Sequence, residues 1–163
     1  MVTSAAFING FIRKLSALGV EVWLDGGWGV DALLGVQSRP HDDLDIVVAE
    51  KDLQRVVNML EKDGFVPVPR PDTRAWNFVL GDRNGQEVDF HVVVFDGVGN
   101  GIYGPPENGD AYPAEAFSGQ GLINGVPVKC MSATSQIANK QGHELRDKDH
   151  HDLRLLRAKF GIA

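Results

Sequence analysis

The sequence has only one cysteine, Cys130, and no apolar run long enough to span a bilayer. A single thiol excludes an intrachain disulfide framework and suits a reducing compartment, where Cys130 is most simply a buried core residue. The N-terminus lacks the basic start and long apolar stretch of a secretory signal. These absences predict a cytoplasmic protein with no membrane partner.

The sequence also has no excess of basic residues. Its 16 Lys and Arg, against 22 Asp and Glu, give a formal net charge of −6. Affinity for nucleic acid comes largely from neutralising phosphates with a basic face, so the sequence predicts no nucleic-acid partner. With 163 residues and 43% hydrophobic content, the chain can bury about two-thirds of its unfolded surface. We therefore expect a single domain over residues 1–163.

Hydrophobic periodicity predicts an α/β (α+β) fold in which a mixed sheet is flanked by helices. Helical spacing covers residues 3–18, a stretch after the glycines at 26–29, and residues 51–62, 133–142 and 147–159. Strand patterns cover residues 20–24, 43–48, 75–80, 87–95 and a small hairpin within 122–129. In the last helix we expect Leu153, Leu156 and Phe160 to face inward.

Residues 97–109 contain five glycines and two prolines and have no periodicity. A loop of this length is unusual inside a compact domain and is typically either functional or disordered. The sequence leaves both readings open for this segment.

The strongest chemical signal is the strand Asp43-Leu44-Asp45-Ile46-Val47-Val48. Residues two apart on a strand point to the same face, so Asp43 and Asp45 project together while the residues between them face a core. Adjacent carboxylates repel each other and are costly to desolvate unless a cation is shared, and a hard ion such as Mg²⁺ suits oxygen ligands best. The alternative is a pair of solvated aspartates at a frayed strand start.

A second strand repeats this pattern, because Asp89 and His91 share one face of Glu87-Val88-Asp89-Phe90-His91-Val92. If this strand lies beside the first, three carboxylates converge as a two-metal site for displacement at phosphorus requires. A surface or hydrogen-bonded core histidine is the alternative for His91.

Glycines also mark a candidate phosphate site, at the end of a strand and the start of a helix. Gly26 and Gly27 allow backbone N–H groups to approach phosphate oxygens, and a helix N-terminus favours anions. The segment is neither a P-loop nor a dinucleotide fingerprint. Trp28 is a candidate substrate contact, although a core anchor is the more common role. Arg39 and His41 are available for the departing phosphates.

In combination, these motifs resemble the polymerase-β-like nucleotidyltransferase superfamily, which has a glycine pair, a DxD strand and a later aspartate. Within it, the chain is most similar to the lincosamide nucleotidyltransferases and the aminoglycoside 2″-adenylyltransferase. The resemblance extends over nearly the whole chain and is weakest in residues 66–78 and 96–121. It is carried by WLDGGWGVDALLG (Trp23 to Gly35), RPHDDLDI, VDFH (Val88 to His91) and KDHHDL (Lys148 to Leu153).

This resemblance implies a polymerase-β-like fold and transfer of a nucleoside monophosphate, with ATP or another nucleoside triphosphate as co-substrate. Asp43, Asp45 and Asp89 would hold two Mg²⁺ ions, and Asp89 would act as base toward the acceptor hydroxyl. The implied nucleotide contacts are Gly26, Gly27, Arg39, Lys148 and Asp149. His91 would lie beside the acceptor, which the resemblance makes a small molecule such as a lincosamide or aminoglycoside antibiotic.

The same resemblance is compatible with a homodimer that completes the acceptor pocket. Two other functions remain open at this point. One is an antitoxin-like transferase that nucleotidylates a partner protein. The other is a catalytically silent nucleotide-binding module, against which the presence of all three carboxylates argues.

Overall fold

The computed structural model describes residues 3–141 and 143–163. In these residues, no helix has the length and apolar character needed to cross a membrane. The helices, with their bounds, are α1 (Ala5–Ala17), α2 (Gly26–Leu34), α3 (Glu50–Lys62), α4 (Ala133–Asn139) and α5 (Asp147–Phe160), together with the short 3₁₀ helices η1 (Pro106–Asn108) and η2 (Ala114–Ser118).

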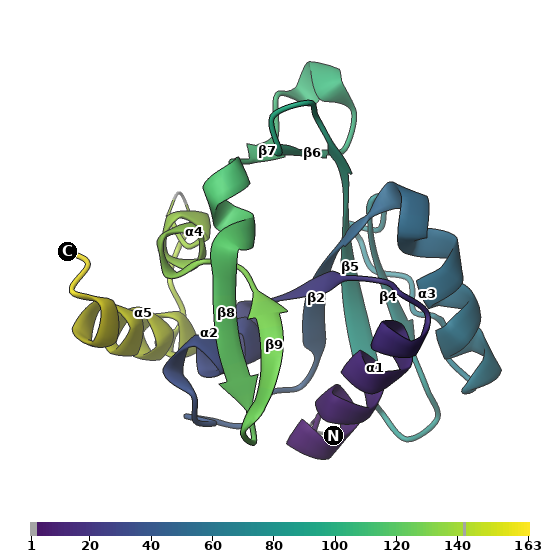
Figure 1. The fold of residues 1–163 in the computed structure, drawn as a ribbon, viewed down its shortest axis with the longest axis horizontal. Helices are drawn as coiled ribbons and strands as arrows, with labels where there is room; N and C mark the ends of the chain where they lie inside the picture. The colour runs from purple at the N-terminus through teal and green to yellow at the C-terminus, as the bar shows by residue number, and fades with distance from the viewer. Residues whose placement is uncertain (1–2, 142) are drawn as a thin grey trace.

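Within the described residues, nine strands form a mixed sheet whose main path runs β3-β4-β5-β2-β1-β9-β8. The β2–β5 and β1–β9 pairs are parallel, while the other pairs are antiparallel. This architecture confirms the predicted mixed sheet flanked by helices (Figure 1). The strands are β1 (Val22–Asp25), β2 (Leu44–Ala49), β3 (Val66–Pro67), β4 (Asn77–Gly81), β5 (Glu87–Phe95), β6 (Gly101–Tyr103), β7 (Ala111–Tyr112), β8 (Gly119–Ile123) and β9 (Val126–Cys130).

Local sequence sets the limits of α2, the helix that follows β1 directly. The side chain of Asp25 accepts a hydrogen bond from Gly26 N at 2.9 Å and caps the helix. Gly35 ends it in the left-handed region, with φ of 77°. The capped end of α2 therefore lies at the end of β1, where the candidate phosphate site is expected.

One face of the sheet packs against the helices and forms the main core. Strand residues Leu24, Ile46 and Phe90 are fully buried there beside side chains of the helices. The aspartates that alternate with them on β1, β2 and β5 point to the opposite face. Cys130 is buried, as expected for a core thiol, whereas Phe160 is 41% exposed and the prediction that it faces inward was wrong.

The Gly/Pro-rich segment after β5 is ordered and contains β6 and η1, so a structureless loop over residues 97–109 was the wrong expectation. Asp96 makes the turn possible, because its carboxylate accepts hydrogen bonds from the backbone N–H groups of Val98 and Asn100. Gly99 supplies the left-handed backbone at φ of 91°. Strand β6 then pairs with both β5 and β7, and together they project from the sheet at the top of Figure 1.

Candidate active site

A row of three aspartates crosses the open face of the sheet. Asp25 on β1 is in register with Asp45 on β2, and Asp45 is in register with Asp89 on β5. Asp43 lies just before β2 and lines one pocket with Asp45 and another with Asp89. The parallel pairing of β2 and β5 therefore brings together the carboxylates that the sequence placed on separate strands.

Asp45, Asp89 and His91 each offer a ligand atom, and these atoms lie within 4.8 Å of one another. His91 Nε2 is 3.4 Å from Asp45 Oδ1 and 4.0 Å from Asp89 Oδ1. Carboxylate oxygens are the donors that Mg²⁺ prefers, and Asp43 adds another next to this group. The donor set fits a hard divalent cation.

Crowding of these acids shifts their protonation. Burial raises the pKa of Asp89 to about 7, and the charges of Asp45 and Asp43 add to this rise against the opposing effect of His91. Burial and the charge of Asp45 likewise raise the pKa of Asp43 to about 6. Burial alone would lower the pKa of His91, but the hydrogen bond and charge of Asp45 dominate and raise it to about 9. The site thus concentrates more negative charge than its own residues neutralise.

Gly26 and Gly27 leave no room for side chains. Gly26 has φ of 57°, and a Cβ there would overlap the carboxylate of Asp45. A Cβ on Gly27 would overlap His41 Nδ1 and lie 2.8 Å from Arg39 Nη2. Bare backbone at the start of α2 therefore borders both the carboxylates and a pair of basic side chains.

A pocket of about 500 Å³ opens over these glycines. Besides Asp43 and Asp45, its wall contains four basic side chains, from Arg39, Lys140, Arg146 and Lys148. The guanidinium of Arg39 donates from Nε and Nη2 to Asp152, at 2.9 and 2.8 Å, and Asp152 is fully buried. A group of basic side chains thereby lies next to the carboxylate row.

Asp149 is a buried hydrogen-bond acceptor for two of these basic side chains. It is 3% exposed, accepts hydrogen bonds from Lys140 Nζ at 3.0 Å and Arg146 Nε at 3.2 Å, and takes part in the capping box of α5. Asp149 lines the pocket, but its carboxylate is occupied by the protein's own cations. Asp149 thus lies at the pocket as the resemblance implies, with its carboxylate paired to Lys140 and Arg146, and its contact with a nucleotide stays a prediction.

His41 and Trp28, two candidates near the glycines, differ in their exposure to the pocket. His41 lines the pocket although it is 4% exposed. Trp28 is 1% exposed, donates from its indole N–H to Thr3 Oγ1 at 2.6 Å, and packs within the helix-side core. Trp28 therefore lies in the core, as the more common role has it, and does not line the pocket over the glycines.

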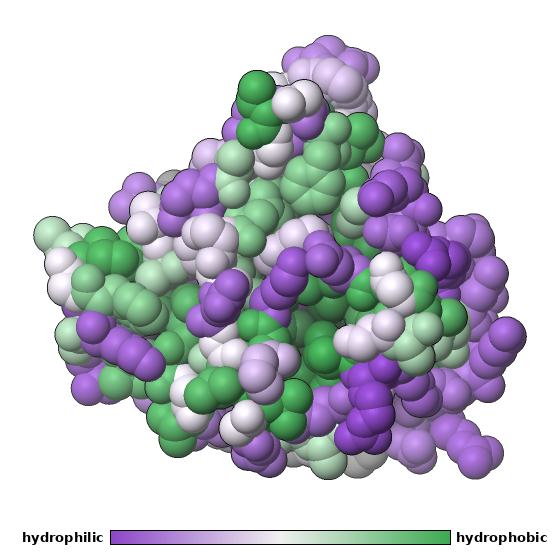
Figure 2. Space-filling view, viewed as in Figure 1, coloured by the Kyte–Doolittle hydropathy of each residue, from purple (hydrophilic) through white to green (hydrophobic). Residues whose placement is uncertain are grey.

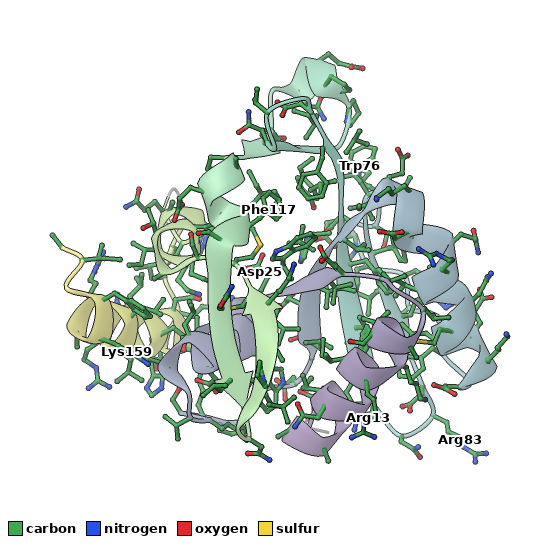
Figure 3. The ribbon with its side chains drawn as sticks, viewed as in Figure 1. Arg13, Asp25, Trp76, Arg83, Phe117 and Lys159 are labelled. Carbon is green, nitrogen blue, oxygen red and sulfur yellow. The ribbon has the colours of Figure 1, made fainter. Side chains whose placement is uncertain are left out.

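On the other side of the carboxylate row, the open face carries an aromatic cluster. Trp23, Val47, Val93, Ala116 and Met131 form its buried base, and Phe95, Tyr103, Tyr112 and Phe117 pack against them. Figure 3 shows Phe117 and Asp25 one above the other below β6 and β7. In Figure 2 hydrophobic and hydrophilic residues are interspersed over this view, with hydrophilic ones at the tip of the β6–β7 projection.

The tyrosines of this cluster lie close to the acids. The rings of Tyr103 and His91 are 6.1 Å apart, and the rings of Tyr103 and Tyr112 are 5.9 Å apart. Burial and then the charge of Asp89 raise the pKa of Tyr103 to about 12, so its hydroxyl stays protonated at neutral pH. This side of the row combines flat apolar surface with hydroxyl donors.

Sequence reasoning missed four residues of the site. Asp25 ends a predicted strand next to the glycine pair, a position that could have marked it as a third member of the row. Asp152 follows Asp149 by three residues on the same helix face, which is a readable sign of a shared role. Lys140 and Arg146 lie between α4 and α5 and carry no comparable spacing signal.

Comparison with known proteins identifies the family of the chain. The family described as Aminoglycoside-2″-adenylyltransferase matches residues 8–156, nearly the whole chain. The chain belongs to this family. It is therefore an enzyme of the nucleotidyltransferase class, and the family implies a nucleoside triphosphate co-substrate and a metal.

Individual relatives of the family include a lincosamide resistance protein of Staphylococcus haemolyticus, 29% identical over 140 residues that cover 85% of each chain. A 2″-aminoglycoside nucleotidyltransferase of Klebsiella pneumoniae is 31% identical over 138 residues, covering 80% of this chain and 68% of the relative. The crystal structure of the lincosamide antibiotic adenylyltransferase LnuA, with lincomycin bound, matches with a TM-score of 0.85, 25% identity and full coverage of both chains.

The aminoglycoside enzyme ANT(2″)-Ia, in complex with adenylyl-2″-tobramycin, has the same fold at a TM-score of 0.73. It is 20% identical to this chain, and the match covers 96% of this chain and 89% of that one.

Proposed function

We propose that this family member transfers AMP from ATP to a hydroxyl of a lincosamide antibiotic. One observation carries the proposal: the in-register row of Asp25, Asp45 and Asp89 lies between a basic pocket and an aromatic wall. A basic pocket suits a polyphosphate, and an aromatic wall suits an organic acceptor. Transfer at phosphorus requires both partners to meet at the carboxylates.

On the basic side, Arg39, Lys140, Arg146 and Lys148 bind the triphosphate together with the backbone of Gly26 and Gly27. These contacts orient the α-phosphorus toward the carboxylate row and neutralise the charge of the departing pyrophosphate. Asp43, Asp45 and Asp89 would hold the two Mg²⁺ ions that the reaction uses. When bound, these ions polarise the phosphate and stabilise the charge that develops on the leaving oxygen.

On the aromatic side, Asp89 accepts the proton of the acceptor hydroxyl. The acceptor oxygen forms a bond to the α-phosphorus, the bond between that phosphorus and the bridging oxygen breaks, and pyrophosphate leaves. His91 lies beside Asp89 and orients the acceptor.

The composition of the wall favours a lincosamide over an aminoglycoside. An aminoglycoside carries many ammonium groups and needs several acids around its rings, whereas a lincosamide carries sugar-like hydroxyls, one amine and an apolar part. Here Tyr103, Tyr112, Phe95 and Phe117 provide aromatic surface and hydroxyls. The full-length match to a lincomycin-bound adenylyltransferase supports the same choice.

A direct test incubates the purified enzyme with Mg·ATP and either lincomycin or an aminoglycoside, and follows pyrophosphate release and the mass of the drug. We expect an AMP-sized mass gain on lincomycin that requires Mg²⁺, and resistance to lincosamides when the chain is expressed in a susceptible bacterium. Transfer to an aminoglycoside alone would overturn the acceptor assignment. Transfer to neither, but to a protein in a lysate, would establish the partner-modifying alternative.

A further inference from the structure

We infer that Asp31 is a positioning residue for the polyphosphate of the nucleotide, and that it acts by holding the imidazole of His41 against the start of α2. The inference rests on the proposed function, because it assigns a residue to the triphosphate half of that site. Asp31 belongs to α2 itself. It does not line the pocket over Gly26 and Gly27.

Contacts with its neighbours fix Asp31 and His41 in place. Asp31 is 1% exposed, and its Oδ2 lies 2.5 Å from His41 Nε2. The other oxygen, Oδ1, accepts a hydrogen bond from Ser38 Oγ at 2.6 Å. The ring of Trp28 packs against that of His41, with centroids 4.8 Å apart. The orientation of the imidazole is therefore set by a carboxylate on one edge and an indole on one face.

The second ring nitrogen of His41 is left for a ligand. Nδ1 is buried and has no hydrogen-bond partner among the described residues. It faces Gly27, where any side chain would overlap it, and the ring lines the pocket. A buried polar atom without a partner costs stability, and such an atom in a native structure calls for an explanation. A phosphate oxygen bound at Gly27 would supply the missing partner to an imidazole that is protonated on both nitrogens, because Nε2–H donates to Asp31 and the phosphate oxygen can only accept from Nδ1–H.

The basic groups nearest Gly27 favour an anion at this point, which under the proposed function is the polyphosphate of the nucleotide. Arg39 Nη2 approaches the same point above Gly27, and Lys148 lines the same pocket. The backbone N–H groups at the start of α2 add the favourable potential of a helix N-terminus. Asp31 lies on this helix, so its contact with His41 fixes the ring relative to the N–H groups that would bind the same phosphate.

Replacement of Asp31 has different effects if its pair with His41 only stabilises the fold and if that pair positions a ligand. If Asp31 only stabilised the fold, its replacement would lower the melting temperature and affect ATP, pyrophosphate and acceptor alike. If it positions His41, its replacement weakens polyphosphate binding while the acceptor KM stays unchanged. The loss should also depend on the presence of the imidazole.

The experiment is a double-mutant cycle of Asp31→Asn and His41→Asn, with binding of pyrophosphate and of a non-hydrolysable Mg·ATP analogue measured by calorimetry. Asparagine at position 41 can place its amide nitrogen near the position of Nδ1 but cannot reach Asp31 as Nε2 does. We expect Asp31→Asn to weaken both ligands about tenfold in the natural background, in the range of one hydrogen bond to a charged group. In the His41→Asn background, the same change should have less than a twofold effect.

A matched control is Asp63→Asn, which removes an exposed carboxylate paired with Lys14. It should leave pyrophosphate binding unchanged. Equal binding by Asp31→Asn and the natural chain, or an equal loss in both His41 backgrounds, would overturn the inference while the proposed function stands. A natural chain that binds neither ligand would overturn the proposed function and the inference together.

If Asp31→Asn fails to fold, the comparison of His41→Asn with His41→Gln takes its place. Glutamine can place its amide near the position of Nε2, where it meets Asp31, but leaves nothing at the position of Nδ1. The inference requires the asparagine variant to bind pyrophosphate several-fold more tightly than the glutamine variant. Equal or reversed affinities would contradict it.

Discussion

The two sides of the carboxylate row are built in different ways. The side proposed to bind the nucleotide uses buried ion pairs, such as Arg39 with Asp152 and Lys140 with Asp149, which hold basic side chains at the pocket. The acceptor side uses aromatic packing, with Tyr103, Tyr112 and Phe117 resting on a small apolar base. Fixed charges suit the triphosphate, which every nucleotidyl transfer uses. Packed aromatic rings suit the acceptor, which differs between relatives.

This difference predicts that substitutions on the two sides separate kinetically. Changes on the nucleotide side should affect the KM for ATP and the stability of the fold together, because the same ion pairs serve both. Changes on the acceptor side should affect the KM for the drug with little effect on ATP. The row between them should control turnover.

The largest effect is expected for Asp89→Asn, which removes the proposed base from the middle of the site. Turnover should fall by about two orders of magnitude or more, while Mg·ATP binding remains measurable. Pyrophosphate release and calorimetry on the same preparations provide the two readouts. Near-normal turnover would remove Asp89 from the mechanism.

Next in size is Asp152→Asn on the nucleotide side. This change removes the charge of Asp152 and one of the two oxygens that accept from Arg39, which should cost about 2 kcal/mol of folding stability, as for one lost hydrogen bond to a charged group. The KM for Mg·ATP should rise about tenfold, since Arg39 is no longer aimed at the pocket. Thermal unfolding and steady-state kinetics check both, with Lys14→Ala at an exposed ion pair as the control. A raised KM for the drug with an unchanged KM for ATP would contradict the assignment of this side to the nucleotide.

A smaller, opposite pattern is expected on the acceptor side. His91→Ala and Tyr103→Phe each remove a polar group facing the drug and should raise its KM about fivefold, as for one lost hydrogen bond. The KM for ATP should change less than twofold. If both KM values rise in parallel, the two sides are not independent.

The smallest effect concerns stability without metal. Asp89 has a pKa raised from 3.8 to about 7, so its contribution to stability is present below pH 4 and is lost as the pH rises through 7. At pH 8 without Mg²⁺, Asp89→Asn should therefore be more stable than the natural chain, by about 1 kcal/mol. The gain should shrink at pH 5 and on addition of Mg²⁺. Equal melting temperatures at pH 8 would show that the crowding of carboxylates carries no cost.

Much of this arrangement was readable in the sequence because it follows local rules. The alternation in residues 43–48 and 87–92 placed the acids on one face, and Gly35 marked the end of α2. The pairing of β2 with β5 required the family resemblance, because alternation does not reveal which strands are neighbours. The combined pattern thus predicted the carboxylate site but not its full row.

Other features depend on tertiary contacts that no local pattern records. The β6–β7 projection exists because Asp96 closes a turn that allows a glycine-rich strand to pair with β5. Trp28 is a core residue because α2 turns its ring away from the pocket, toward Thr3. The link between Arg39 and Asp152 spans 113 positions, and no local pattern shows that these two residues are partners.

That same long link has a consequence for the order in which the molecule is completed during synthesis. Arg39 and the glycines emerge from the ribosome early, whereas Asp152 and Lys148 arrive with α5 near the end of the described chain. A chain halted before α5 would have its carboxylates but lack the partner that orients Arg39. Mg·ATP would then stabilise finished molecules in preference to partial ones, because a ligand stabilises only the state that binds it.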